Sequence, residues 1–110
     1  MNDINTTFAE RGKRYGAFTS HARIAQSIKR AMQNHTNWHT ALDDDQREAL
    51  EMVAHKIGRI LNGDPNYADS WHDIVGYTKL VEDRLNIAAA LRAVSDDVIH
   101  DAIAKSMTVE

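Results

Sequence analysis

The sequence predicts an all-α protein that folds as one bundle of about four helices. Apolar residues recur every three or four positions along several long segments, which is the periodicity of an amphipathic helix. No segment shows the alternation of β-branched and polar residues that is typical of a strand. One Pro, five Gly and a hydrophobic content of 43% in 110 residues fit a soluble helical protein. A chain of this length is expected to form a single domain.

The composition also excludes several kinds of protein. Without any Cys, the chain forms neither disulfides nor a thiolate zinc site. The first residues are polar and contain no apolar run that would serve as a signal peptide or a membrane span. We therefore expect a cytoplasmic protein with no membrane partner.

Residues 1–18 are predicted to form a basic, weakly structured N-terminal arm, because Gly12 and Gly16 interrupt any helix there. The helical bundle is then expected to span residues 19–110. Charge is uneven: residues 1–30 carry six basic and two acidic residues (6 − 2 = +4), and the others seven and fourteen (7 − 14 = −7). A basic arm suits nucleotide phosphates, nucleic acid or an acidic partner subunit, although a solvated helix start explains it equally well.

The first helix is predicted over residues 20–34, with Thr19 or Ser20 as its N-cap. Its apolar positions follow a helical rhythm and are Ile24, Ala25, Ile28, Ala31 and Met32. The following residues, 35–44, are expected to form a connector whose Trp38 packs against the bundle.

The second helix is predicted to begin at Asp44 or Asp45, because Asp45 and Glu48 have the spacing of a capping box. It is expected to end at Gly63 through a left-handed glycine cap. One face carries an apolar stripe, made of Leu50, Val53, Ile57, Ile60 and Leu61.

Ser70 is predicted to cap a third helix that runs to about Val94. A short fourth helix is expected over residues 98–107, because residues 95–97, Ser-Asp-Asp, resemble a new helix start.

Four acidic residues of the second and third helices are candidate magnesium ligands. Glu48 and Glu51 lie three residues apart, and Asp69 and Asp73 lie four apart, so each pair shares one helical face. Magnesium prefers such oxygen ligands, together with substrate phosphates and water. Capping and the helix dipole explain Glu48 and Asp73 as well. The two pairs lie at opposite ends of a simple helical hairpin, so they would meet only with a second subunit.

Two basic residues of the second helix are candidate phosphate ligands. Lys56 and Arg59 lie about one turn apart, and Arg binds phosphate with a bidentate fork. Intrahelical pairing with the nearby acids is the alternative explanation. Tyr77 is placed to stack on a base, although a half-buried bundle tyrosine is the commoner arrangement.

Three motifs resemble those of a group of small phage and prophage proteins of poorly known role: RYGAF at residues 14–18, HKIGRILNGD at 55–64 and DSWHDIVGYTKL at 69–80. More distantly, the chain resembles the MazG-like all-α nucleoside triphosphate pyrophosphohydrolases. Their pattern Glu-Glu-x-x-Glu followed by Glu-x-x-Asp is matched here by Glu48, Glu51 and Asp73. Arg47 and Ser70 stand where the pattern has acids, and Asp69 adjoins the second of these positions.

This resemblance implies a MazG-like bundle and magnesium-dependent cleavage of a (deoxy)nucleoside triphosphate to the monophosphate and pyrophosphate. Mg²⁺ would be held by Glu48, Glu51, Asp73 and Asp69, and would activate the attacking water. Catalysis would then involve Glu51, Lys56 and Arg59, the last two stabilising phosphate charge. The nucleotide would also contact the arm and the third helix, through Arg11, Lys13, Arg14, Tyr15 and Tyr77.

The resemblance also implies a homodimer or homotetramer in the cytoplasm of a bacterial host. Two alternatives remain open, because the acidic pattern is incomplete. The scaffold would bind a nucleotide or another small phosphorylated ligand without cleaving it, or it would act as an accessory factor that binds a host protein. A nucleic-acid partner is not expected, since no recognition-helix pattern follows the basic segment.

Overall fold

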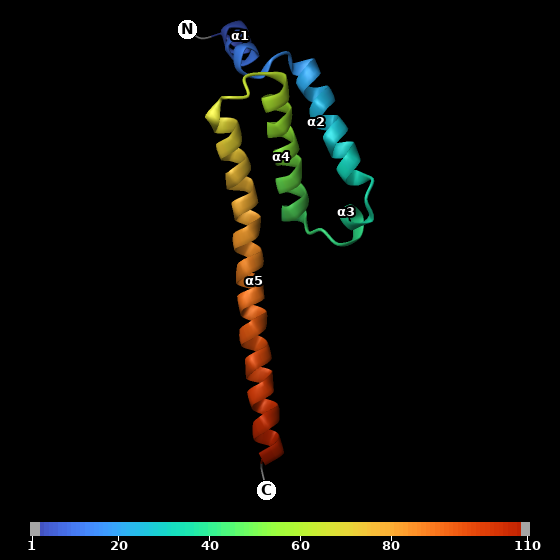
Figure 1. Cartoon of the computed structure of the whole chain (residues 1–110), viewed down its shortest axis with the longest axis vertical. Coiled ribbons are helices and arrows are strands. Elements are labelled where there is room, and N and C mark those ends of the chain that lie inside the picture. The colour runs from blue at the N-terminus through green and yellow to red at the C-terminus, as the bar shows by residue number, and fades with distance from the viewer. Residues whose placement is uncertain (1–2, 109–110) are drawn as a thin grey trace. The chain divides into compact units, whose positions relative to one another are not determined.

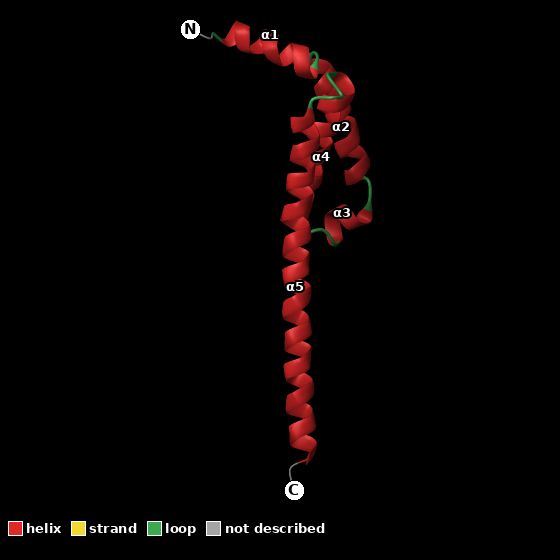
Figure 2. Ribbon diagram, turned by 60° about the vertical axis from the view of Figure 1, so that its left-hand side comes forward, coloured by secondary structure: helices red, strands yellow, loops and turns green. Residues whose placement is uncertain are grey.

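The computed structural model describes the backbone of residues 3–108 and the side chains of residues 3–106. Its five helices are α1 (Ile4–Tyr15), α2 (Phe18–Gln33), α3 (Thr36–Thr40), α4 (Asp44–Asn62) and α5 (Ala68–Thr108) (Figure 1). No strand occurs within these described residues, so the prediction of an all-α protein is confirmed (Figure 2). The structure has one helix more than the expected four, and the boundaries also differ.

The chain divides into two compact units, residues 1–79 and residues 80–110. The first unit contains α1 to α4 and the first turns of α5. The second consists of the C-terminal part of α5. The single bundle over residues 19–110 remains a prediction from the sequence.

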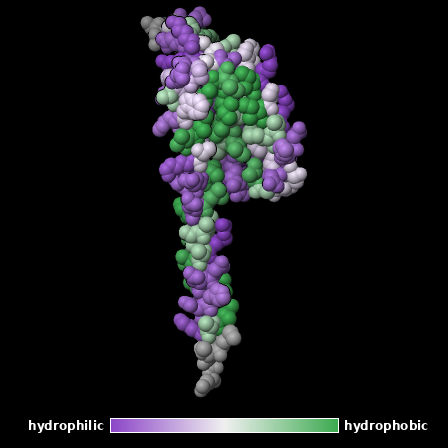
Figure 3. Space-filling view, in the orientation of Figure 1, coloured by the Kyte–Doolittle hydropathy of each residue, from purple (hydrophilic) through white to green (hydrophobic). Residues whose placement is uncertain are grey.

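The core of the first unit lies between α2 and α4, which run antiparallel side by side. It is small, and its buried apolar residues are Ala25, Trp38, Ala49, Ala54 and Ile60. Trp38 of α3 therefore packs against the bundle as predicted. The predicted α4 stripe is only partly buried, because Leu50 and Leu61 are exposed. Apolar residues consequently form a visible patch on the surface of this unit (Figure 3).

The N-terminal arm is helical rather than weakly structured. Asp3 precedes α1, and its carboxylate accepts a hydrogen bond from the Thr6 backbone N–H at 2.9 Å. Gly12 lies inside this helix, and Gly16 ends it. Only two residues then separate α1 from α2, whose N-cap is Ala17 rather than the predicted Thr19 or Ser20. The N-cap Asp3 stabilises this helix, whereas the interior Gly12 lowers its stability by only about 1 kcal/mol, so the helix forms.

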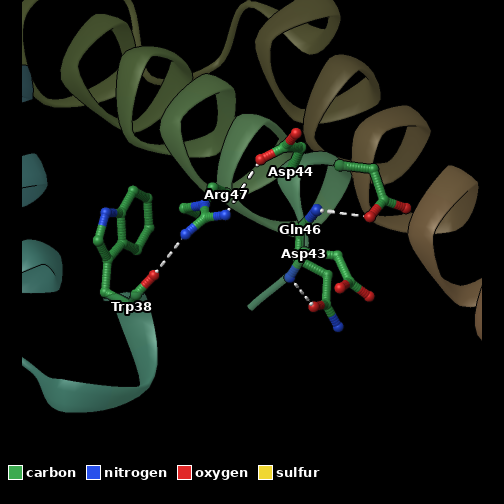
Figure 4. A network of polar contacts seen from close by, with 6 residues as sticks. Trp38, Asp43, Asp44, Gln46 and Arg47 are labelled. Atoms are coloured by element: carbon green, nitrogen blue, oxygen red, sulfur yellow. Dashed lines mark hydrogen bonds and ion pairs between the residues drawn. The ribbon is translucent and has the colours of Figure 1, made fainter. Parts of the chain in front are cut away.

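Helix α4 begins at Asp44, one of the two predicted starts, but its capping box is not formed by Asp45 and Glu48. Its N-cap is Asp43, and the Gln46 side chain accepts a hydrogen bond from the Asp43 backbone N–H at 2.8 Å (Figure 4). Arg47 then joins α4 to α3, because its guanidinium donates to the Trp38 carbonyl at 2.9 Å and pairs with Asp44 at 3.0 Å. Glu48 is therefore not the third residue of the box.

The other end of α4 lies at Gly63 as predicted, but not through a left-handed cap, since its φ is −131°. Glycine is required here because the backbone of Arg14 and Tyr15 lies against residue 63. A Cβ at this position would collide with the Arg14 carbonyl oxygen and the Tyr15 Cα. Sequence patterns detect that a helix stops at a glycine without revealing which of these reasons applies.

Helix α5 also differs from its prediction at both ends. It begins at Ala68, so Ser70 lies within the first turn and is buried rather than capping. It continues through Ser95, Asp96 and Asp97, where a break was predicted. These three side chains are exposed, where polar residues are compatible with a continuing helix. Among the described residues, no helix has the length and apolar character needed to cross a membrane.

Candidate ligand-binding groove

A groove of about 690 Å³ opens on the first unit where α1, α2 and α4 meet. Its volume lies in the range of about 300–1,000 Å³ that is typical of small-molecule sites. The residues that line it come from three helices and one turn, and they are Phe8, Arg11, Gly12, Tyr15, Gly16, Ala17, Phe18, His21, His55 and Arg59. Aromatic and basic side chains dominate the set, and no carboxylate belongs to it.

The groove owes its shape to the turn between α1 and α2, which is held against the end of α4. The Asn62 side-chain amide donates to the carbonyl oxygens of Tyr15 at 2.7 Å and Ala17 at 2.9 Å. The Asp64 backbone N–H donates to the Arg14 carbonyl at 2.6 Å. Gly16 makes the turn possible, since its φ is +74° and a Cβ there would collide with Asn62.

Two histidines that line the groove contact each other. His21 Nε2 of α2 and His55 Nδ1 of α4 lie 3.2 Å apart, and their rings meet edge to face. Burial and the positive charges of Arg59, Lys29 and Lys56 lower the pKa of His21, and they lower the pKa of His55 to about 4. Both imidazoles are therefore neutral at pH 7, with one nitrogen donating to the other. His21 Nδ1 is buried and has no hydrogen-bond partner among the described residues.

Arg59 and Arg11 supply the positive charge of the groove. The Arg59 guanidinium lies 4.1 Å from the centre of the Tyr15 ring, a cation–π contact that fixes the side chain at the groove wall. Arg11 lines the opposite helix and is exposed. No carboxylate is among the residues that line the groove, and neither guanidinium belongs to an ion pair found among the described residues.

The other predicted nucleotide contacts lie elsewhere. Arg14 points at Tyr67, with its guanidinium 5.0 Å from the ring centre and 3.4 Å from the hydroxyl. The Tyr67 hydroxyl in turn donates to Asp69 at 3.0 Å. Lys13 is exposed, and neither it nor Tyr77, which is half-buried on α5, lines the groove.

The predicted magnesium ligands are not gathered at one point. Asp73 pairs with Lys56 at 2.9 Å, and this contact lowers the pKa of the Asp73 carboxyl. Asp69 accepts from Tyr67, Glu48 is exposed and Glu51 is half-buried. Among the described side chains, no group of three or more His, Asp or Glu residues is arranged to hold a metal. The physical reason is the antiparallel course of α4 and α5, which start at opposite ends of the hairpin.

Of the predicted site residues, the structure thus brings together Arg11, Tyr15 and Arg59. Sequence reasoning missed Phe8, Phe18 and His21 as lining residues. His21 carried a usable signal: it lies four residues before Ala25 on the apolar face of its helix, where a polar side chain needs a partner.

Comparison with known proteins adds a family and no function. A family model described as "Domain of unknown function (DUF6378)" matches residues 3–85. No curated protein and no solved structure matches the chain. The matched region contains the whole groove and all three sequence motifs, and it ends within α5. Because the match covers most of its length, the chain belongs to the DUF6378 family.

Proposed function

We propose that the protein binds a nucleotide, or a closely similar phosphorylated small molecule, in the groove between α1, α2 and α4. The observation that carries this proposal is the pairing of two guanidiniums with exposed aromatic rings in one groove of ligand size that no carboxylate lines. Arg binds phosphate oxygens with two parallel hydrogen bonds. Aromatic faces offer a stacking surface for a base.

Each part of such a ligand has a matching part of the groove. Arg59 and Arg11 face the phosphates from two helices. Phe8 and Phe18, which expose 62% and 77% of their surface, offer faces to the base. His55 keeps one ring nitrogen, Nε2, outside its contact with His21, and a neutral imidazole costs less to desolvate than an ion. The resemblance of the sequence to nucleotide pyrophosphohydrolases supports the same ligand class.

Thermal unfolding with a panel of ribo- and deoxynucleotides, with and without Mg²⁺, tests this proposal. A ligand at ten times its dissociation constant stabilises the folded state by about 1.4 kcal/mol. For a domain of this size we expect the Tm to rise by several degrees. Arg11→Ala should lower the affinity about ten-fold or more, because a lost charge-assisted hydrogen bond costs about 1.5–3 kcal/mol.

Arg23→Ala is the matched control, since Arg23 is also an exposed helical arginine but lies outside the groove. If both variants weaken binding equally, the ligand is attracted by the general charge of the N-terminal region, and the groove proposal is wrong. If no nucleotide changes the Tm, the accessory role of binding a host protein becomes the better hypothesis.

Magnesium-dependent hydrolysis by a MazG-like oligomer is our second candidate function. The observation in its favour is Asp73, which matches the last acid of the pyrophosphohydrolase pattern. Its ion pair with Lys56 holds the carboxylate in place and lowers its pKa, so the carboxylate is ionised. We propose that Glu48 and Glu51 of one subunit approach Asp69 and Asp73 of another, so that four carboxylates and Mg²⁺ form one site. The metal would then supply charge neutralisation and an activated water.

Detection of nucleoside monophosphate and pyrophosphate tests this second function directly. We expect turnover only with Mg²⁺, and loss of turnover in Glu51→Gln with nucleotide binding to the groove retained. Binding without turnover would leave the first function standing and eliminate the second.

A further inference from the structure

The C-terminal part of α5 carries a heptad seam. Positions that alternate at four- and three-residue intervals are Leu80, Arg84, Ile87, Leu91, Val94, Val98, Asp101 and Lys105. This spacing is the a/d repeat of a coiled coil, which keeps one stripe of a helix facing a partner helix. Most of the seam lies beyond residue 85, where the family match ends.

The seam is exposed along its whole apolar length. Leu80, Ile87, Leu91, Val94 and Val98 each expose between 61% and 69% of their surface. Polar residues are interspersed along the same stretch of surface (Figure 3). A helix gains most of its stability in proteins by packing an apolar face, and residues 80–106 pack against nothing else in their own unit.

The order of residues along the seam identifies the partner. The seam positions are symmetric about the point between Arg92 and Ala93, so reversing the direction of the helix places seam positions on seam positions. The four central apolar residues then face one another, and Leu80 lies opposite Lys105. In an antiparallel pair, Leu91 lies opposite Val94 and Ile87 lies opposite Val98. The same reversal places Arg84 opposite Asp101.

Charge excludes the parallel alternative. A parallel in-register pair would place Arg84 against Arg84 and Asp101 against Asp101 within the seam. Like charges that face each other in a partly desolvated seam are unfavourable, and opposite charges set register and orientation. The same residues are therefore mismatched in a parallel pair and matched in an antiparallel one.

We propose that residues 80–105 of α5 pair antiparallel with the same residues of a second copy of this chain. The pair is centred between residues 92 and 93 and buries Ile87, Leu91, Val94 and Val98 of each copy. This pairing is independent of the groove and of its proposed ligand, because it uses none of the lining residues.

Charge reversal in the full-length chain tests the orientation. Sedimentation equilibrium should show a dimer or a multiple of it for the natural sequence. Arg84→Asp places acid against Asp101 of the second copy, and Asp101→Arg places base against Arg84, so each should weaken association at least ten-fold. The double variant restores opposite charges and should recover the association. In a parallel pair, the double variant would leave like charges facing each other.

Cysteine cross-linking tests the register, and the natural chain contains no Cys to interfere. A mixture of Ile87→Cys and Val98→Cys chains should form a disulfide-linked heterodimer on mild oxidation. Ile87→Cys alone should not, because its two copies would lie about 16 Å apart along the helix axis, and a disulfide requires Cα atoms within about 7 Å.

Circular dichroism confirms that each variant keeps its helix content before association is compared. A monomer at high micromolar concentration, association unaffected by either charge reversal, or efficient cross-linking of Ile87→Cys with itself would each overturn the proposal. Association only with a different protein, with the chain alone monomeric, would overturn it equally.

Discussion

Gly58 of α4 lies close to the ring of His21 of α2. A Cβ on Gly58 would lie 2.9 Å from His21 Nδ1 and 3.0 Å from His21 Cε1. His21 is buried and hydrogen-bonded to His55, so its ring has little freedom to move away. The absence of a side chain at residue 58 therefore sets the distance between the two main helices of the first unit.

Gly58→Ala should lower the free energy of unfolding by about 1–3 kcal/mol, the usual cost of overpacking a core. Urea unfolding followed by circular dichroism measures this change. Gly76→Ala is the matched control, because Gly76 is also helical and nothing lies within 4 Å of its added Cβ. The control should be stabilised by about 0.5–1 kcal/mol. Equal stabilisation of both variants would contradict the close contact.

The histidine pair should make stability depend on pH between about 4 and 6.5. The pKa of His55 falls from 6.5 when unfolded to about 4 when folded, and that of His21 is also lowered. The unfolded chain therefore binds more protons in this window, so stability is complete above pH 6.5 and declines as the pH falls. Since the groove is open to solvent, we expect a loss of about 1–2 kcal/mol.

Urea unfolding at pH 7.5 and pH 5 measures this loss. His55→Gln removes the titrating group while keeping a hydrogen-bonding side chain, and it should show a clearly smaller difference between the two pH values. Asp73, whose pKa is lowered, titrates below this window and contributes only at more acidic pH. An unchanged difference in His55→Gln would show that other groups cause the dependence.

At the scale of elements, the ion pair between Lys56 and Asp73 joins α4 to the first turns of α5. Lys56 is buried, with 8% of its surface exposed, whereas the side chain of Asp73 is 42% exposed. The buried ammonium of Lys56 therefore depends more on its partner for charge compensation than the partly exposed carboxylate of Asp73 does. Removing the carboxylate leaves a buried ammonium without an opposite charge, which is costlier than leaving a solvated carboxylate alone.

Asp73→Ala should consequently destabilise the protein more than Lys56→Met, which keeps an apolar chain of similar length in the buried site. Comparison of the urea midpoints of both variants with the natural protein measures the order. The double variant should resemble Lys56→Met, because the buried charge is absent from both. A larger loss for Lys56→Met than for Asp73→Ala would contradict this account.

Helices that pack in the core were predicted well from the sequence. Helix ends and helices with exposed polar residues were predicted poorly. The periodic segments of α2 and α4 and the packing of Trp38 were evident, because core contacts require apolar spacing. The helix of the N-terminal arm and the continuity of α5 through Ser95 were missed. In both places, exposed polar residues are compatible with either a cap or a continuing helix.

The groove was predictable only in parts, because its residues come from segments far apart in the chain. Arg59 and the arm were identified by charge, but nothing in the sequence places Phe18 beside His55. For the predicted metal site, the sequence showed regularly spaced acids on each of two helices. In the structure, however, Asp73 of α5 contacts Lys56 of α4 rather than another acid. Spacing reveals a shared face of one helix, and only the fold reveals which faces meet.

At the scale of the whole molecule, two of the three sequence motifs meet in space. Residues 14–18 form the α1–α2 turn, and residues 55–64 end α4 beneath it, with Asn62 and Asp64 bonded to the turn. Arg59 and His55 of the second motif line the groove together with Tyr15 and Phe18 of the first. Both motifs therefore specify one groove, and the family match over residues 3–85 includes all of it.

The two units should consequently differ in how their stability responds to protein concentration. The α2–α4 core is packed within one chain, whereas the seam of residues 80–105 is proposed to be packed by a second copy. Dilution below the dissociation constant of the dimer should therefore speed amide hydrogen exchange in residues 86–106 and leave exchange in α2 and α4 unchanged. Mass spectrometry of peptides at two concentrations measures both regions in one experiment. Leu91→Asp, which places a charge in the seam, should show fast exchange of residues 86–106 at either concentration. Equal protection of that segment at all concentrations would mean that a single chain stabilises it, and the proposed pairing would then be wrong.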